Sequence, residues 1–105
     1  MDAVTPLELK AEIDQGRGPL VLDVRNPDEV AICRIPGSTV IPFPELADRM
    51  GELDPAAPIV VHCKSGGRSQ KAVALLGQAG FTHVRNLTGG ILGWIRDVDP
   101  GLTPY

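Results

Sequence analysis

The chain has 105 residues, of which 43% are hydrophobic and 22% charged, and its formal net charge is −3. This length predicts one domain, residues 1–105, that buries about 65% of its unfolded surface. The acidic balance and the lack of a basic stripe argue against nucleic acid as a partner. No apolar run approaches the ~20 residues that cross a membrane, and the first residues do not read as a signal peptide.

The first part of the chain predicts a short strand and then a helix. Val4 is expected to end the strand. Thr5 can cap the helix and Glu8 can complete a capping box, with a proline between them in the first turn. The spacing of Leu9 and Ile13 predicts that both face inward.

Residues 20–24 form an apolar run interrupted by one acid, Asp23, which predicts a strand buried on both faces. Asp23 and Arg25 allow two interpretations. In the first, Asp23 accepts from nearby backbone N–H groups and Arg25 pairs with a carboxylate such as Glu29, as charged groups near a core usually do. In the second, both support the loop that begins at Cys63 from behind.

The middle of the chain predicts further short elements. Asn26 or Asp28 is expected to cap a helix. Residues 38–41 are expected to form a brief strand. Pro44 suits the first turn of the next helix. Residues 58–61 are apolar and rich in β-branched residues, which predicts the central buried strand over residues 58–62.

The last third predicts a helix, a strand and a closing helix. Residues 70–79 carry apolar side chains at helical spacing, and Gly80 is a natural left-handed cap. Residues 84–87 predict the last strand and residues 91–95 the closing helix, with Trp94 in the core. Alternating strands and helices predict an α/β domain, with a central parallel sheet of about five short strands and helices on both faces.

A cysteine at the end of the central strand is followed by a glycine-containing loop that could activate its thiol. Glycines let successive backbone N–H groups point at one spot, and the helix that follows adds the positive end of its dipole. A thiol in this setting ionises more easily, and the thiolate is the nucleophile. The plainer interpretation is a small buried residue before an ordinary glycine turn. The residues concerned are Cys63 as the catalytic group and Lys64, Ser65, Gly66, Gly67, Arg68 and Ser69 as substrate-binding groups.

These residues resemble the active-site loop of rhodanese-type sulfurtransferases. Three more stretches resemble the other signatures of that family in the same order, namely residues 22–25, 35–42 and 88–94. Residues 32–36 and the tail 99–105 are most similar to the rhodanese domain at the C-terminus of adenylating sulfurylases that serve ubiquitin-like sulfur carriers. Many rhodaneses have Gly-His where this chain has Cys33 and Arg34.

The resemblance implies a single rhodanese-like domain that transfers sulfur. Cys63 would take the outer sulfur of thiosulfate or of a protein persulfide, such as that of a cysteine desulfurase, and pass it from a persulfide to a thiophilic acceptor. The implied acceptor is the activated C-terminal glycine of a ubiquitin-like sulfur carrier, beside an adenylating domain. No metal or organic cofactor is implied. A reactive thiol is most useful in a reducing compartment, which predicts the cytoplasm.

Two other functions are compatible with the loop. A cysteine-dependent phosphatase also uses a cysteine, a backbone cradle and an arginine, but it places five residues between them where this chain has four. A non-catalytic binding module with the same fold is the other alternative, although inactive relatives typically lose the cysteine or its glycines.

The remaining cysteine and the histidines carry weaker signals. His62 precedes Cys63 on the strand, so its side chain should point to the opposite face, as a satisfied core histidine rather than a catalytic base. His83 is expected in a solvated turn. Cys33 has apolar neighbours and is expected to be buried and inert, the alternative being a resolving thiol. Two histidines and two cysteines at these spacings predict no metal site.

Overall fold

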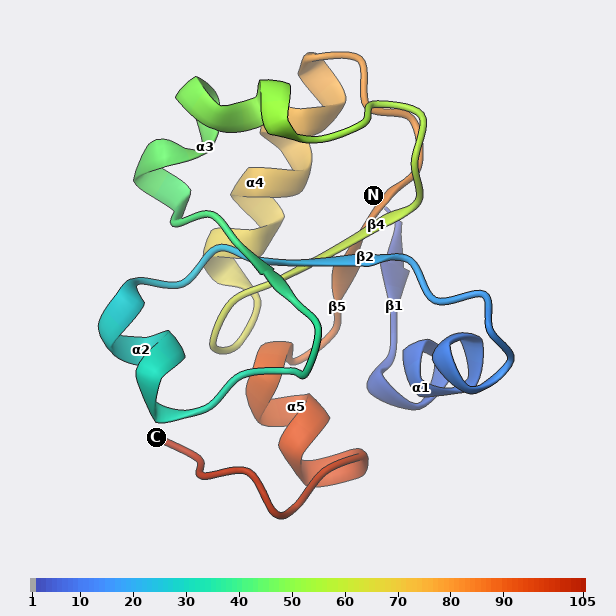
Figure 1. The fold of residues 1–105 in the computed structure, drawn as a ribbon, viewed down its shortest axis with the longest axis vertical. Helices are drawn as coiled ribbons and strands as arrows, with labels where there is room; N and C mark the ends of the chain where they lie inside the picture. Colours follow the sequence, from blue (N-terminus) through green and yellow to red (C-terminus); the bar gives the residue numbers. More distant parts are fainter. Residues whose placement is uncertain (1) are drawn as a thin grey trace.

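The computed structural model describes residues 2–105. Within these residues the chain forms a five-stranded parallel sheet with the order β1-β5-β4-β2-β3 (Figure 1). The strands are β1 (Ala3–Val4), β2 (Leu20–Asp23), β3 (Thr39–Val40), β4 (Ile59–His62) and β5 (Val84–Leu87). The predicted α/β class with a parallel sheet of about five short strands is confirmed.

Helices connect the strands and cover both faces of the sheet. They are α1 (Pro6–Asp14), α2 (Pro27–Ile32), α3 (Phe43–Arg49), the short 3-10 helix η1 (Met50–Glu52), α4 (Gly67–Gln78) and α5 (Gly90–Asp97). The predicted capping box of α1 is present: Thr5 Oγ1 accepts from the Glu8 N–H at 3.2 Å, and Glu8 Oε1 accepts from the Thr5 N–H at 2.9 Å.

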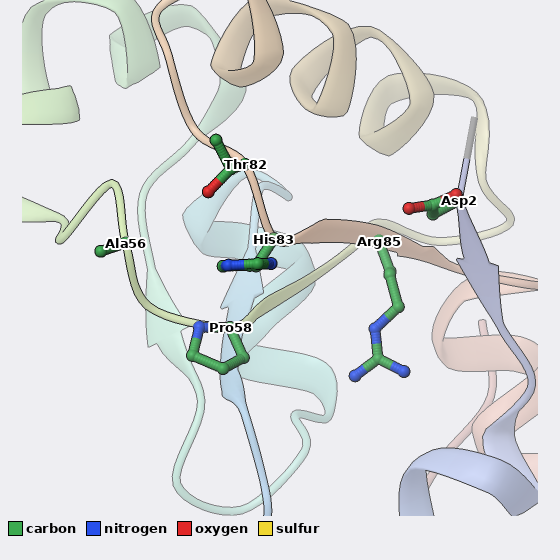
Figure 2. Close-up of a pocket in the computed structure, with 6 residues that line it drawn as sticks. All are labelled: Asp2, Ala56, Pro58, Thr82, His83 and Arg85. Atoms are coloured by element: carbon green, nitrogen blue, oxygen red, sulfur yellow. The ribbon is translucent and has the colours of Figure 1, made fainter.

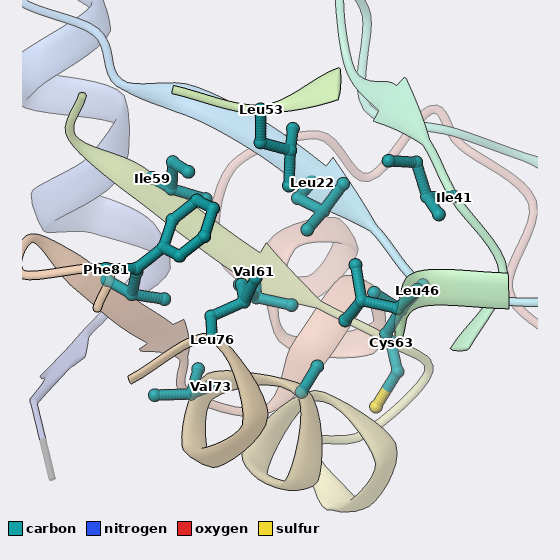
Figure 3. Packing of buried hydrophobic residues seen from close by; sticks show 13 residues of the cluster. Leu22, Ile41, Leu46, Leu53, Ile59, Val61, Cys63, Val73, Leu76 and Phe81 are labelled. Atoms are coloured by element: carbon teal, nitrogen blue, oxygen red, sulfur yellow. The ribbon is translucent and has the colours of Figure 1, made fainter. Parts of the chain in front are cut away.

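Alternate side chains of the buried strands face two separate apolar clusters. On one face, Leu22 of β2 and Val61 of β4 pack with Leu46 of α3 and Leu76 of α4 (Figure 3). Cys63 belongs to this cluster and lies at its edge. This α3/α4 cluster therefore anchors the residue that begins the glycine-containing loop.

The second cluster lies on the other face of the sheet. It joins Val21 of β2 and Val60 of β4 to Leu9 of α1 and to Ile91 and Trp94 of α5. Trp94 is 5% exposed, so its predicted place in the core is confirmed. Strands buried on both faces explain why β2 and β4 are apolar almost throughout.

The order in which the chain adds strands to the sheet changes direction between β2 and β4. The connection from β2 runs to β3 at one edge, whereas β4 is followed by β5 on its other side. In open parallel sheets this arrangement leaves a crevice beyond the carboxyl ends of the two strands. Cys63 follows β4 and Arg25 lies two residues beyond β2, so both are at this end of the sheet.

One predicted core position is wrong. Ile13 is 39% exposed, whereas Leu9 is completely buried. The reason is that α1 ends at Asp14, and Ile13 in its last turn packs beside the turn at Gly18 rather than on the sheet. Among residues 2–105, no helix is long and apolar enough to cross a bilayer.

Candidate active site

The loop after β4 wraps around the sulfur of Cys63. Gly66 has a φ of +125°, a conformation that side-chain-bearing residues rarely adopt. This turn brings the Gly66 N–H to 3.1 Å from Cys63 Sγ, where it donates a hydrogen bond. Helix α4 begins at the next residue, so its positive end lies beside the sulfur.

Ser69 approaches the same sulfur from the first turn of α4. It is completely buried, and its Oγ lies 3.4 Å from Cys63 Sγ. The hydroxyl also lies 3.1 Å from the Gly66 carbonyl oxygen and 2.6 Å from Oδ1 of Asn86. Asn86 is a buried residue of β5, so the hydroxyl is positioned by the neighbouring strand.

These contacts change the acidity of the thiol. Burial raises the pKa of Cys63, but hydrogen bonds from Ser69, Gly66 and Ser65 outweigh it, and the net pKa lies below that of an ordinary cysteine. The thiolate is the reactive form of cysteine. The loop therefore favours the nucleophilic thiolate form of Cys63.

A Ser69→Ala substitution is expected to raise the pKa of Cys63, because it removes one donor to the thiolate. The thiolate fraction at neutral pH then falls, and alkylation by iodoacetamide slows by about tenfold or more, since a hydrogen bond to a charged group contributes about 1.5–3 kcal/mol. At a pH above both pKa values the rates should converge. The pH profile of alkylation measures this shift.

The matched control for this experiment is Ser38→Ala. Ser38 is also a buried serine, but its oxygens contact Arg34 rather than the loop. Both variants are best made in a Cys33→Ala background, so that Cys63 is the thiol that reacts. An identical pH profile for Ser69→Ala and Ser38→Ala would show that the Ser69 hydroxyl does not stabilise the thiolate.

The N-terminus of α5 supports the loop from the other side. The N–H groups of Ile91 and Leu92 donate to the carbonyl oxygens of Cys63 at 3.0 Å and Lys64 at 3.2 Å. A Cβ on Gly90 would lie 2.4 Å from the Lys64 oxygen. The loop is therefore held between two helix N-termini: that of α4 faces the sulfur, and that of α5 faces the carbonyl groups.

The two cations of the loop are not free side chains. Arg68 makes a bidentate ion pair with Glu29 of α2, with N–O distances of 2.6 Å and 2.8 Å. The ammonium of Lys64 lies 4.7 Å from the ring centroid of Tyr105. Neither partner was expected from the sequence, where Glu29 was the proposed partner of Arg25.

The buried charges behind the loop pair with each other. Arg25 and Asp23 are both completely buried, and Arg25 Nη2 lies 2.6 Å from Asp23 Oδ2. The predicted Arg25–Glu29 ion pair is wrong, because Arg25 reaches only the backbone oxygen of Glu29, at 3.3 Å. The prediction that Asp23 accepts from a local backbone N–H is met by the N–H of Arg25, at 3.1 Å.

His62 is buried, as predicted, but it is not fully satisfied. Its Nδ1 lies 3.1 Å from the Cys63 carbonyl oxygen, while Nε2 has no hydrogen-bond partner among residues 2–105. Burial lowers the pKa of His62, although Asp23 opposes the shift. A neutral ring that contacts the backbone of Cys63 agrees with a structural role. His83 is exposed, as predicted.

Cys33 lies on the other side of the sheet from Cys63. It is 7% exposed and belongs to the α1/α5 cluster, whereas Cys63 belongs to the α3/α4 cluster. Its setting is less apolar than predicted, because Arg25 Nη2 donates to its carbonyl oxygen at 2.7 Å and Nη1 lies 4.0 Å from its sulfur. A disulfide needs Cβ atoms about 3.5–4.5 Å apart. The positions of the two cysteines on opposite faces of the sheet do not favour such a short distance.

A Cys33→Ala substitution is therefore expected to keep the specificity constant for thiosulfate within about twofold, while lowering stability by about 1–2 kcal/mol through lost packing. The measurement is steady-state kinetics with intact mass under non-reducing conditions. An internal disulfide that forms in the wild type on turnover, together with persulfide accumulation in the variant, would identify Cys33 as a redox partner instead.

A cavity of about 410 Å³ lies far from this loop. Figure 2 shows its lining, which includes Pro58, His83 and Arg85. Pro58 precedes β4 and His83 precedes β5, so the cavity is at the amino ends of these strands, opposite Cys63. Within the part of the chain that the structure describes, no group of three or more potential ligands could hold a metal ion.

Four residues of the site were missed or misassigned from the sequence: Glu29, Asn86, Gly90 and Tyr105. Asn86 carried a usable signal, because it is a polar residue inside an otherwise apolar strand. Gly90 carried one as part of a glycine pair before a helix. The positions of Glu29 and Tyr105 depend on long-range packing that no local pattern reports.

Comparisons with known proteins point to one family. The family model described as "Rhodanese-like domain" matches residues 5–97. A protein of Mycobacterium tuberculosis named "Probable adenylyltransferase/sulfurtransferase MoeZ" is 35% identical in an alignment of 104 residues that covers 97% of this chain and 26% of that protein. The chain thus spans about a quarter of that relative's length, and the expected similarity to adenylating sulfurtransferases is confirmed.

Two proteins of similar size support the same assignment. A protein of Allochromatium vinosum named "Sulfurtransferase" is 39% identical over 85 residues, covering 81% of this chain and 79% of that protein. The crystal structure of SSP1007 from Staphylococcus saprophyticus has a TM-score of 0.86 and 32% identity, covering 98% and 99% of the two chains. By family model, relatives and fold, the chain belongs to the rhodanese-like domain family.

Proposed function

We propose that the domain transfers sulfane sulfur through a persulfide on Cys63. The observation that carries this proposal is the cradle around the sulfur, where the Gly66 N–H lies at 3.1 Å and the Ser69 hydroxyl at 3.4 Å. The same donors that favour the thiolate would favour the anionic persulfide. The relatives named sulfurtransferases support the reaction class.

The reaction has two half-reactions. The Cys63 thiolate attacks the outer sulfur of thiosulfate, a new S–S bond forms, and sulfite leaves with the electron pair of the broken S–S bond. An acceptor such as cyanide then attacks the terminal sulfur, a C–S bond forms, and thiocyanate leaves while Cys63 recovers its electron pair as a thiolate. No external oxidant or reductant is consumed.

The roles of the loop residues follow from their positions. Backbone N–H groups of residues 65–69 hold the anionic sulfur, and the buried Ser69 hydroxyl completes the cradle. Gly66 provides the turn, and the exposed Gly67 leaves the front of the loop open, since a Cβ there would meet nothing within 4 Å. Lys64 and Arg68 supply positive charge, although that of Arg68 is offset by its ion pair with Glu29. Asp23 and Arg25 support the loop indirectly, from the end of β2.

The physiological donor and acceptor are proposed from the relatives. A protein persulfide, such as that of a cysteine desulfurase, is proposed as the donor because the family resemblance implies it. The name "Probable adenylyltransferase/sulfurtransferase MoeZ" of the M. tuberculosis relative supports an acceptor activated by adenylation, which we take to be a ubiquitin-like sulfur carrier beside an adenylating domain. We place this chemistry in the cytoplasm, where thiols stay reduced, with no metal or organic cofactor.

The size of the loop disfavours a phosphatase. Four residues separate Cys63 from Arg68, so the ring of N–H groups is small and suits one sulfur better than a phosphoryl group with three equatorial oxygens. In addition, Glu29 already occupies both outer nitrogens of Arg68. Hydrolysis of an aryl phosphate without thiocyanate formation would reverse this preference.

The kinetic test is to vary thiosulfate and cyanide together and follow thiocyanate. A covalent intermediate predicts ping-pong kinetics, with parallel lines in a double-reciprocal plot and sulfite released before cyanide reacts. Intersecting lines would mean direct transfer between two bound substrates. If neither thiosulfate, methanethiosulfonate nor a persulfide donor yields thiocyanate, the proposal fails and a binding module is favoured.

A further inference from the structure

We propose that Glu29, positioned by Tyr105, is a specificity-determining residue that lowers the positive charge at the Cys63 loop and so favours monoanionic sulfur donors over dianionic ones. The inference rests on the proposed sulfur transfer and adds the charge class of its donor. The contacts that support it join the loop to two residues outside it, Glu29 on α2 and Tyr105 on the segment after α5.

Glu29 neutralises the arginine of the loop. Its two carboxylate oxygens take both outer nitrogens of Arg68, at 2.6 Å and 2.8 Å, across 39 residues of sequence. The Glu29 side chain is 15% exposed and that of Arg68 35% exposed. Hydrogen bonds from Arg68, which outweigh partial burial, lower the pKa of Glu29 to about 2, so the carboxylate stays charged at neutral pH.

Tyr105 contacts both Lys64 and Glu29, the carboxylate that pairs with Arg68. Its hydroxyl donates to Glu29 Oε2 at 2.8 Å and accepts from Arg25 Nη1 at 3.2 Å. Its ring lies under the Lys64 ammonium, with 4.7 Å between the nitrogen and the ring centroid, a distance typical of a cation–π contact. Tyr105 is therefore a positioning residue, which holds Glu29 against Arg68 and directs Lys64.

The charges in this connected set nearly cancel. Within the described residues, the ion pairs join Arg68 to Glu29 and Arg25 to Asp23, and Lys64 has no carboxylate partner. The set therefore leaves one uncompensated positive charge, which lies on Lys64. A dianion such as thiosulfate is attracted to a site of this charge less strongly than to one where Arg68 is also free.

The consequence concerns the choice of donor. Thiosulfate carries two negative charges, whereas methanethiosulfonate and a cysteine persulfide carry one at the reacting group. With methanethiosulfonate, Cys63 forms the same S–S bond and methanesulfinate leaves with the electron pair of the broken bond. The two small donors thus give the same persulfide and differ in charge, so their ratio of specificity constants reports the charge at the loop.

The experiment compares thiosulfate with methanethiosulfonate in the wild type and in Glu29→Gln, with cyanide as the acceptor. Removing the carboxylate should raise kcat/KM for thiosulfate and increase the thiosulfate-to-methanethiosulfonate ratio by about three- to tenfold, because a charge acts twice as strongly on a dianion. Glu29→Asp keeps the charge and should retain a ratio close to that of the wild type.

The matched control is Glu12→Gln. Glu12 also makes a bidentate pair with an arginine, Arg85, with both distances 2.8 Å, but this pair lies between α1 and β5, away from the loop. The substitution changes the net charge equally and should leave the ratio unchanged. An equal change in Glu12→Gln and Glu29→Gln would overturn the proposal, because the effect would then follow from net charge.

The role of Tyr105 is tested by two substitutions that separate its ring from its hydroxyl. Tyr105→Ala frees Lys64 and loosens Glu29, so the ratio should rise as in Glu29→Gln. Tyr105→Phe keeps the ring under Lys64 and should change the ratio less. A ratio that stays at the wild-type value in Tyr105→Ala would contradict the positioning role.

Failure of this inference can be told apart from failure of the proposed function. Activity with both donors and an unchanged ratio in Glu29→Gln overturns the inference alone, whereas a wild type inactive with every donor overturns both. If Glu29→Gln does not fold, the salt dependence of the wild type decides. A weak loss of thiosulfate kcat/KM with added salt supports a nearly neutral loop, and a steep loss contradicts it.

Discussion

Replacing Cys63 by serine is expected to lower the rate of sulfur transfer by about a thousandfold or more, because the reaction passes through a covalent bond to this sulfur. The thermal midpoint should change little. Serine is close to cysteine in size, and its hydroxyl can accept from the Gly66 N–H and bond to Ser69, as the sulfur does. Thiocyanate formation and thermal unfolding, measured on the same sample, test both parts.

The control for this experiment is Cys33→Ala, which removes the other buried thiol. It should remain active, so that loss of rate is tied to Cys63 and not to the removal of any cysteine. If Cys63→Ser retained full activity with a native thermal midpoint, the assignment of the nucleophile would be wrong.

Replacing Gly90 by alanine is expected to be the most destabilising single change near the site. The added Cβ would lie 2.4 Å from the Lys64 oxygen and 2.8 Å from the Cys63 oxygen, and Gly90 has a φ of +60°. These are backbone atoms, so the loop or the start of α5 must move. Overpacking and left-handed strain together should cost about 2–5 kcal/mol, which corresponds to a thermal midpoint roughly 10–20 °C lower.

Activity should fall together with stability in Gly90→Ala, because the shifted carbonyls belong to Cys63 and Lys64. Gly77→Ala provides the comparison. Gly77 lies inside α4, and a Cβ there would meet nothing within 4 Å. The free energy of unfolding of Gly77→Ala should therefore rise by about 0.5–1 kcal/mol. A Gly90→Ala protein with an unchanged thermal midpoint would show that the close approach of α5 to the loop is not required.

Local signals in the sequence were sufficient to predict most of the fold. Residues 84–87 were predicted as the last strand and form β5. The capping box at Thr5 could be predicted because its two hydrogen bonds lie within one turn of the chain. Periodicity failed at Ile13, which has the spacing of a buried residue but lies in the last turn of α1, beside the turn at Gly18, and is exposed.

The charged partners in the site could not be predicted in the same way. From the sequence, Glu29 was offered as a carboxylate for Arg25, and Asp23 was assigned to nearby backbone N–H groups. In the fold, Asp23 lies closer to Arg25, and α2 carries Glu29 to Arg68, 39 residues away. Tyr105 meets Glu29 across 76 residues. Ion pairs of this kind are set by tertiary packing, which propensity and spacing do not report.

The most direct test of the account is the mass of the protein after it has been mixed with a sulfur donor and separated from it without reductant. Wild type treated with thiosulfate or methanethiosulfonate should gain the mass of one sulfur atom, located on the peptide that contains Cys63, and should lose it when cyanide is added. Cys63→Ser should gain nothing. A wild type that remains at its original mass with every donor, or that carries the added sulfur on Cys33, would contradict the central claim that Cys63 holds the transferred sulfur.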